Sequence, residues 1–296
     1  MSVAIAAGGL ARQRAKRRLW LIEAGSAILG LFLLIWSLFP VYNMFLIALD
    51  PEEGEIEFTG HIYPPEPSLD AFWVVLTQSD RYLADFWQQF GNSLYIGLAT
   101  MLLTVLLGSL ASFAAGRMRL GMGSLVTGAA LFTYVIPAGF LIIPFYLIMH
   151  SYGLADNLWA VIAAQVTFAT PFAILILRYY ANLIPLEVDD AARVDGASNL
   201  QLYLRIYLPL TAPALAVVAV WAMVLAWNDY LYQAVLLTSP SKTTVSMMQG
   251  DLFEDPDAAW NAMMAAVIIY ALPPIVILFA LRRYMAAGLT MATAKG

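Results

Sequence analysis

Cysteine is absent from this chain of 296 residues, and histidine occurs only twice. The lack of cysteine excludes disulfides, thiolate metal sites and cysteine nucleophiles. His61 and His150 are far apart in the sequence and lie outside the long apolar runs, so a histidine-based metal or catalytic site is not expected. No clustered set of His, Cys or acidic residues of the kind a membrane enzyme needs is found. The sequence therefore predicts no catalytic residue, no metal site and no cofactor bound by this chain.

Charge is also scarce, because only 12% of the residues are charged whereas 61% are hydrophobic. Soluble domains are usually about one quarter charged and about half apolar. A chain with this much apolar surface needs the bilayer as part of its solvent. The composition predicts an integral membrane protein surrounded by lipid, and the net charge of -5 argues against a nucleic-acid partner.

Six stretches are long and apolar enough to cross a hydrocarbon core, which takes about 20 residues of helix. They cover residues 24–46, 93–115, 125–149, 158–177, 214–237 and 262–281. We therefore expect an all-α integral membrane protein with six transmembrane helices. The membrane domain is predicted over residues 20–284, between a basic N-terminal segment at 1–19 and a tail at 285–296.

The basic residues indicate the orientation of these helices. With the N-terminus inside the cell, 13 of the 15 basic residues fall on cytoplasmic segments, and only Arg81 and Lys242 fall outside. Lys and Arg near helix ends resist translocation, so both termini are predicted to be cytoplasmic. Two long segments, residues 50–90 and 238–261, are then external. Each is either a solvated loop or a docking surface for an external partner.

A cytoplasmic loop at residues 182–209, between the fourth and fifth stretches, carries the most information. Gly196 separates two short amphipathic segments, which predicts two short helices joined by a left-handed turn. Ala191 and Ala192 keep one face small enough for another surface to approach closely. The loop is interpreted as a helix hairpin that fits a groove on a cytoplasmic motor, and a merely solvated connector is the alternative.

This loop resembles the coupling loop of importer permeases, whose pattern is E-A-A-x3-G-x9-I-x-L-P. The matching positions are Asp190, Ala191, Ala192, Gly196, Ile206, Leu208 and Pro209, with Asp in place of the leading Glu. Residues 227–230 and 288–296 resemble the maltose-permease G-type half of carbohydrate importers. The resemblance implies the permease fold of type I ATP-binding-cassette importers, with the cytoplasmic coupling-helix hairpin between spans 4 and 5.

The resemblance also implies a set of partners in a bacterial inner membrane. They are a second, F-type permease subunit, two cytoplasmic ATPase subunits and an external solute-binding protein. The chain has no G-x-x-x-x-G-K-S/T motif, which is the usual phosphate-binding loop, so ATP and Mg are expected on the ATPase subunits and this chain is not itself an enzyme. The implied function is uptake of a sugar or sugar-like solute, with residues 190–209 coupling the permease to the ATPases.

Asp229 is the clearest ionisable residue inside the predicted spans, where a carboxylate is costly enough to suggest a function. It either lines the solute pathway or makes a hydrogen bond between helices or subunits. Asn228, Gln165 and Tyr134 are weaker candidates of the same kind. The alternative function is a secondary transporter in which Asp229 carries a proton or cation. The coupling loop and the lack of a detectable inverted repeat argue against it.

Overall fold

The computed structural model describes residues 2–51, 63–64, 66–118, 121, 123–254 and 258–293, and every regular element within these ranges is a helix. The acidic stretch at 52–62 and the last three residues of the predicted tail lie outside the described residues. The chain divides into two compact units, which are described separately. They are Met1–Trp73 with Ala259–Ile268, and Val74–Ala258 with Ile269–Gly296.

The first unit contains helix α1, Ser2–Ala48, and the beginning of α13, Trp260–Thr293. From Arg18 to Ala48, α1 has the length and the apolar composition of a membrane span, and most of its large apolar side chains are exposed. A helix that is apolar on all sides is typical of a membrane span. The end of α1 is joined to the start of α13 by the Asn261 side chain, which donates to the Asp50 carbonyl at 3.0 Å.

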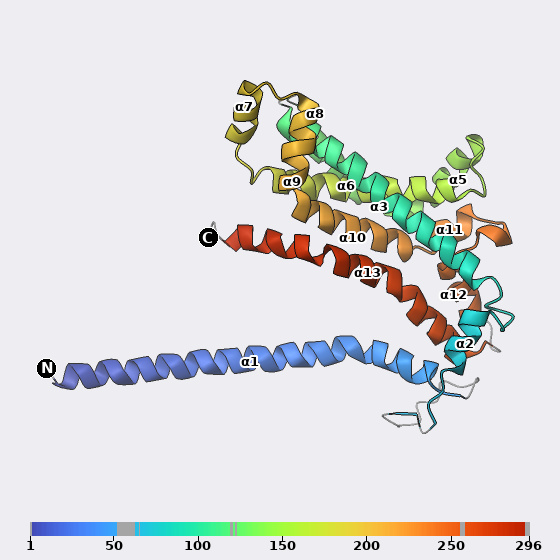
Figure 1. Cartoon of the computed structure of the whole chain (residues 1–296), viewed down its shortest axis with the longest axis horizontal. Coiled ribbons are helices and arrows are strands. Elements are labelled where there is room, and N and C mark those ends of the chain that lie inside the picture. Colours follow the sequence, from blue (N-terminus) through green and yellow to red (C-terminus); the bar gives the residue numbers. More distant parts are fainter. Residues whose placement is uncertain are drawn as a thin grey trace. The chain divides into compact units, whose positions relative to one another are not determined.

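Three helices form the framework of the second unit, and they run alongside one another in Figure 1. They are α3, Phe86–Arg117, α6, Leu158–Ala181, and α10, Ala212–Trp227. The backbones of α3 and α6 approach closely, since a methyl group added at Gly108 would lie 2.5 Å from the Cβ of Ala173. Small residues at such contacts are typical of helix packing in membranes, where close van der Waals contact replaces the hydrophobic effect.

Two of the six predicted spans are broken. The first half of the third span is α4, Gly123–Phe132, with the 3-10 turn η1, Thr133–Val135. Its second half is the 3-10 turn η2, Ala138–Leu141, followed by α5, Ile142–Ser151. The two halves meet at 88°, and Ile136 between them is extended because a following proline disfavours helical backbone. In the fifth predicted span, helix α10 ends at Trp227, and the chain becomes helical again in α11, Leu231–Leu236.

The remaining short helices connect these elements. They are α2, Asp70–Thr77; α7, Glu187–Val194; α8, Asn199–Leu202; the π-helical turn η3, Tyr203–Tyr207; α9, Leu208–Leu210; η4, Pro240–Lys242; and α12, Val245–Glu254. A second bend, of 78°, separates residues 199–210 from α10. Among the described residues, four unbroken helices have the length and composition of membrane spans, or six if each bent pair counts as one. The predicted helical membrane protein is confirmed, with between four and six spans.

Candidate functional site

The loop at residues 182–209 forms a pair of short helices, α7 and α8, as the sequence predicts. Gly196 lies between them with a φ of +83°, a conformation in which a side chain is strained. The Ser198 hydroxyl caps α8 by accepting from the Gln201 backbone N–H, and the Gln201 side chain accepts from the Ser198 N–H in return. This reciprocal capping box satisfies two N–H groups at the helix start, so the turn after Gly196 is fixed by local sequence.

The two alanines of the loop motif point to different surroundings. Ala191 is exposed, as is Asp190. Ala192 is half-buried and packs against an apolar cluster built on Phe113, Tyr203 and Tyr207. Other motif residues are divided in the same way: Ile206 and Leu208 pack against that cluster, while Pro209 is exposed. The open part of the hairpin is therefore smaller than the motif.

Large apolar side chains also remain open on the hairpin. Val194 is 87% exposed, Leu200 is 65% exposed and Leu204 is 51% exposed. Val188 is 38% exposed on the same helix as Ala191. Exposed apolar side chains gathered on one element mark an interaction site when they form a contiguous patch.

A buried ion pair attaches α7 to the end of α3. The Nε atom of Arg117 lies 2.8 Å from Oδ2 of Asp189, and Nη2 lies 3.2 Å from Oδ1, in a two-pronged contact. The same guanidinium donates to the Ile184 carbonyl at 2.9 Å. No local pattern in the sequence predicts this pair, because Arg117 and Asp189 are 72 positions apart.

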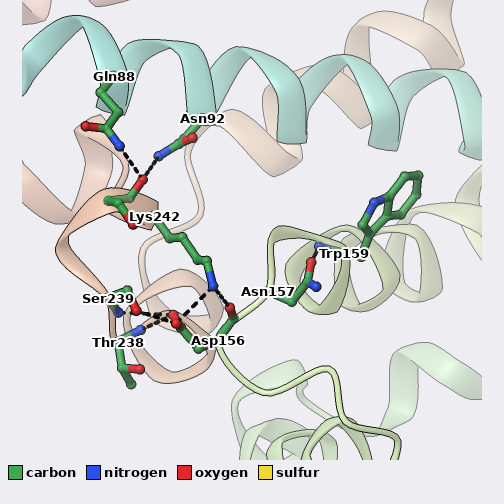
Figure 2. Close-up of polar contacts among 9 residues, drawn as sticks. Gln88, Asn92, Asp156, Asn157, Trp159, Thr238, Ser239 and Lys242 are labelled. Atoms are coloured by element: carbon green, nitrogen blue, oxygen red, sulfur yellow. Dashed lines mark hydrogen bonds and ion pairs between the residues drawn. The ribbon is translucent and has the colours of Figure 1, made fainter.

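At the other end of this unit, the Asp156 carboxylate holds the segment that follows α11 (Figure 2). It accepts from the backbone N–H groups of Thr238 and Ser239 at 2.9 and 3.0 Å, and from the Ser239 hydroxyl. The Lys242 ammonium lies 3.0 Å from the same carboxylate. These donors, the Ser239 hydroxyl first, hold the pKa of Asp156 well below its usual range because they favour the charged form.

Helix α3 holds the same segment from its other side. Figure 2 shows Gln88 and Asn92 reaching from α3 towards the segment. Both side-chain amides donate to the Ser241 carbonyl, at 2.7 and 3.1 Å, and Asn92 also donates to the Thr243 carbonyl at 2.9 Å. We call residues 238–243 with these contacts the polar clamp. It fixes the start of the predicted external segment 238–261, of which residues 255–257 lie outside the described part.

A cavity of about 460 Å³ brings together three of the four predicted pathway residues. Gln165 of α6, and Asn228 and Asp229 of the break after α10, line it together with Phe168 and Trp221. The fourth, Tyr134, lies on η1 and is not among the lining residues. Among the described residues, no three His, Cys, Asp or Glu side chains come together as metal ligands.

Asp229 is held at the break by backbone donors. Its Oδ2 atom accepts from the Gln233 N–H at 3.2 Å, and the Gln165 side chain also contacts the carboxylate. The Tyr232 hydroxyl donates to the Ala138 carbonyl at 2.6 Å. This last bond ties the break of the fifth span to the break of the third.

Comparisons with known proteins place these features in context. Residues 105–291 match the family described as binding-protein-dependent transport system inner membrane component. The inner membrane ABC transporter permease protein YcjP of Escherichia coli (strain K12) is 33% identical, over 90% of this chain and 94% of that protein. The trehalose transport system permease protein SugB of Mycobacterium tuberculosis is 30% identical, over 91% and 97%. The crystal structure of a bacterial ABC transporter that imports the acidic polysaccharide alginate contains a similar chain, with a TM-score of 0.71, 23% identity and coverage of 91% and 97%.

Proposed function

The chain belongs to the family of binding-protein-dependent transport system inner membrane components, and on this premise we propose that it is a permease subunit of an ATP-driven importer for a sugar or sugar-like solute. The family match carries the proposal, because it spans the hairpin and the cavity together. The sugar class is supported by relatives named for trehalose, arabinooligosaccharides and maltodextrin. The secondary-transporter alternative is not favoured by any of these relatives.

The partners follow from the same proposal. A second, F-type permease subunit completes the membrane pathway, an external binding protein delivers the solute, and two cytoplasmic ATPase subunits bind ATP and Mg. Both termini face the cytoplasm of the bacterial cell. The polar clamp supports the order of the spans behind this orientation, because its contacts join residue 156 to residues 238–243, which the predicted spans put on the same side of the membrane.

Coupling to the ATPases is assigned to the hairpin at 190–209. Its support is the exposed surface around Ala191 and Val188, together with the buried Arg117–Asp189 pair that attaches α7 to α3. An apolar surface transmits force only if it is attached to the helices that move. The ion pair provides that attachment, since α3 is one of the three framework helices of its unit.

The solute pathway is proposed to include Asp229, Asn228 and Gln165, whose side chains share one cavity. Tyr134 stays a weaker candidate, because it is half-exposed on a different element. Hydroxyl groups of a sugar match carboxylate and amide side chains, which accept and donate hydrogen bonds.

The proposal is tested by enlarging the open face of the hairpin. Ala191→Trp places a large side chain on the exposed surface without entering the apolar cluster, so we expect the chain to insert normally but to retain at least tenfold less ATPase subunit on purification. Overpacking a contact costs typically about 1–3 kcal/mol. The matched control is Ser151→Trp, at an exposed residue at the end of α5, which should leave retention unchanged.

The turn of the hairpin offers a second test at Gly196. No atom lies within 4 Å of a Cβ built there, so only the backbone conformation opposes substitution. Gly196→Val is expected to weaken ATPase retention, because a β-branched residue is strained at positive φ by about 1 kcal/mol or more. Gly196→Asn should be nearly silent, since Asn tolerates this region. Normal retention in both Ala191→Trp and Gly196→Val would remove the hairpin from the coupling contact.

A further inference from the structure

The two broken spans of the second unit meet at one cavity. Ala138, just after Pro137 in the break of the third span, lines the cavity, and so do Asn228 and Asp229 in the break of the fifth. The Tyr232 hydroxyl, which donates to the Ala138 carbonyl at 2.6 Å, joins the two breaks directly. The contact between the two breaks is therefore part of the fold.

A break in a membrane helix restricts what can occupy the space beside it. Backbone groups freed at a break have no water in the hydrocarbon core, so non-helical backbone is tolerated there only where protein buries it or where it lines a water-filled cavity. Here Asn228 is exposed and Asp229 is half-buried. The cavity has room for a solute, because about 460 Å³ lies within the range of about 300–1,000 Å³ of small-molecule sites.

The walls combine an apolar surface with a few polar groups. Trp221 lines the cavity and stacks on Phe172, with ring centroids 4.2 Å apart. Gln165 and Asn228 add two amides, which donate and accept. Small-molecule sites commonly have this composition, with apolar and aromatic walls and a small number of placed polar side chains.

The cavity carries a negative formal charge. Asp229 is its only ionisable acid, and no Lys or Arg is among the lining residues in the described part of the chain. Its recorded contacts are the backbone N–H groups of Tyr232 and Gln233 and the Gln165 side chain, none of which carries a positive charge. An uncompensated carboxylate at the wall attracts cations and repels anions.

We propose that this cavity is a hydrated solute chamber contributed by this subunit, and that it accepts neutral or cationic solutes with hydrogen-bonding groups and repels anionic ones. The inference rests on the proposed importer function and narrows its substrate class to uncharged sugars rather than acidic ones. The carboxylate accepts hydrogen bonds from hydroxyl groups, and the aromatic wall covers the apolar face of a sugar ring.

The test uses a single cysteine at Asn228→Cys, which is clean because the chain has no cysteine of its own. The purified complex is treated with a cationic or an anionic methanethiosulfonate reagent of similar size, and labelling of this chain is followed by mass. Each rate is divided by that of glutathione with the same reagent. A carboxylate about 5 Å from a charged reagent in water changes the labelling rate by roughly fourfold, upward for the cationic reagent and downward for the anionic one. Salt reduces this effect.

We therefore expect a corrected cation-to-anion ratio of roughly fivefold or more at Asn228→Cys. Asp229→Asn in the same background should bring the ratio close to one, and the matched control Asp251→Asn, an exposed acid on α12, should leave it unchanged. The first ratio is measured with Asp229 intact, so the test does not depend on the folding of the Asp229 variant. Val224→Cys, also at the cavity wall, serves as a second reporter.

Two results would overturn the chamber. One is a lack of labelling at both reporters in the folded complex when the denatured chain labels fully, since the cavity would then be closed to water. The other is a ratio near one with Asp229 present. The ATPase activity of the same preparation separates the two proposals. A cation-to-anion labelling ratio near one in a preparation that retains the ATPase refutes the chamber alone. Absence of an ATPase refutes the importer function itself.

Discussion

Replacing Arg117 by methionine removes the guanidinium that attaches α7 to α3. The two side chains of the Arg117–Asp189 pair are only 4% and 8% exposed, so the remaining carboxylate would be buried without its partner. Removing one member of a buried pair typically costs about 3–5 kcal/mol. The Ile184 carbonyl also loses a charged donor, an interaction of about 1.5–3 kcal/mol that partly overlaps with this figure. We expect Arg117→Met to lower the free energy of unfolding by about 3–5 kcal/mol.

The double variant Arg117→Met with Asp189→Leu distinguishes an ion pair from simple packing. Replacing both members by apolar residues of similar size removes the charges together, and this change is often neutral or even stabilising. We expect the double variant to unfold within about 1–2 kcal/mol of the wild type, which gives a coupling energy of at least about 2 kcal/mol in a double-mutant cycle. The assay is equilibrium unfolding in detergent micelles of the wild type, both single variants and the double variant.

Additive costs in that cycle would refute the reasoning, because the two residues would then act independently. A wild-type stability for Arg117→Met would refute it more simply. Arg117→Lys serves as a control for charge without the two-pronged geometry, and we expect it to be intermediate, because an ammonium cannot match both carboxylate oxygens and the Ile184 carbonyl at once.

Three further predictions test the packing of α3 on α6, the polar clamp and the orientation. Gly108→Ala should destabilise by about 1–3 kcal/mol through overpacking against α6, whereas Gly116→Ala, with open space around it, should be neutral or slightly stabilising in thermal unfolding. Asp156→Asn should speed hydrogen exchange at the two amides it holds by at least tenfold. Since the pKa of Asp156 is lowered in the fold, wild-type protection should be constant above about pH 4 and be lost only on acidification. Ser241→Cys should react with an impermeant thiol reagent on whole cells and Val194→Cys should not, and the reverse would overturn the orientation.

Much of the hairpin could be predicted from the sequence, because its determinants are local. Gly196 supplies the left-handed residue at the turn, and the Ser198 cap lies two positions further along the chain. The separate surroundings of Ala191 and Ala192 could not be predicted in this way. They depend on where α3 delivers Phe113, which is about 80 residues away in the chain and has no local signal.

The two helix breaks also differ in how far they can be predicted from the sequence. Pro137 is visible in the sequence, although a proline predicts a kink as readily as a break of 88°. The break at Asn228 and Asp229 has neither proline nor glycine. Short polar side chains compete with the helix by bonding to nearby backbone groups, as Asp229 does with the Gln233 N–H, but hydropathy predicts a continuous span there.

The polar clamp could not be predicted at all, since its charged members Asp156 and Lys242 are separated by 86 positions. The charge pattern puts both on the same side of the membrane but says nothing about contact. Its α3 members Gln88 and Asn92 lie 153 and 149 positions from Ser241 in the chain, and no local pattern predicts their contacts with it.

The central claim, that this chain is one membrane subunit of an ATP-driven importer, is tested most directly by purifying the tagged chain from its native membranes in mild detergent. The preparation is assayed for ATP hydrolysis and its components are identified by mass spectrometry. We expect a second permease and an ATPase subunit to be recovered with the chain, together with ATP hydrolysis that a solute-loaded binding protein stimulates. A monodisperse homo-oligomer that transports solute, contains no ATPase and loses uptake with an uncoupler would contradict the claim.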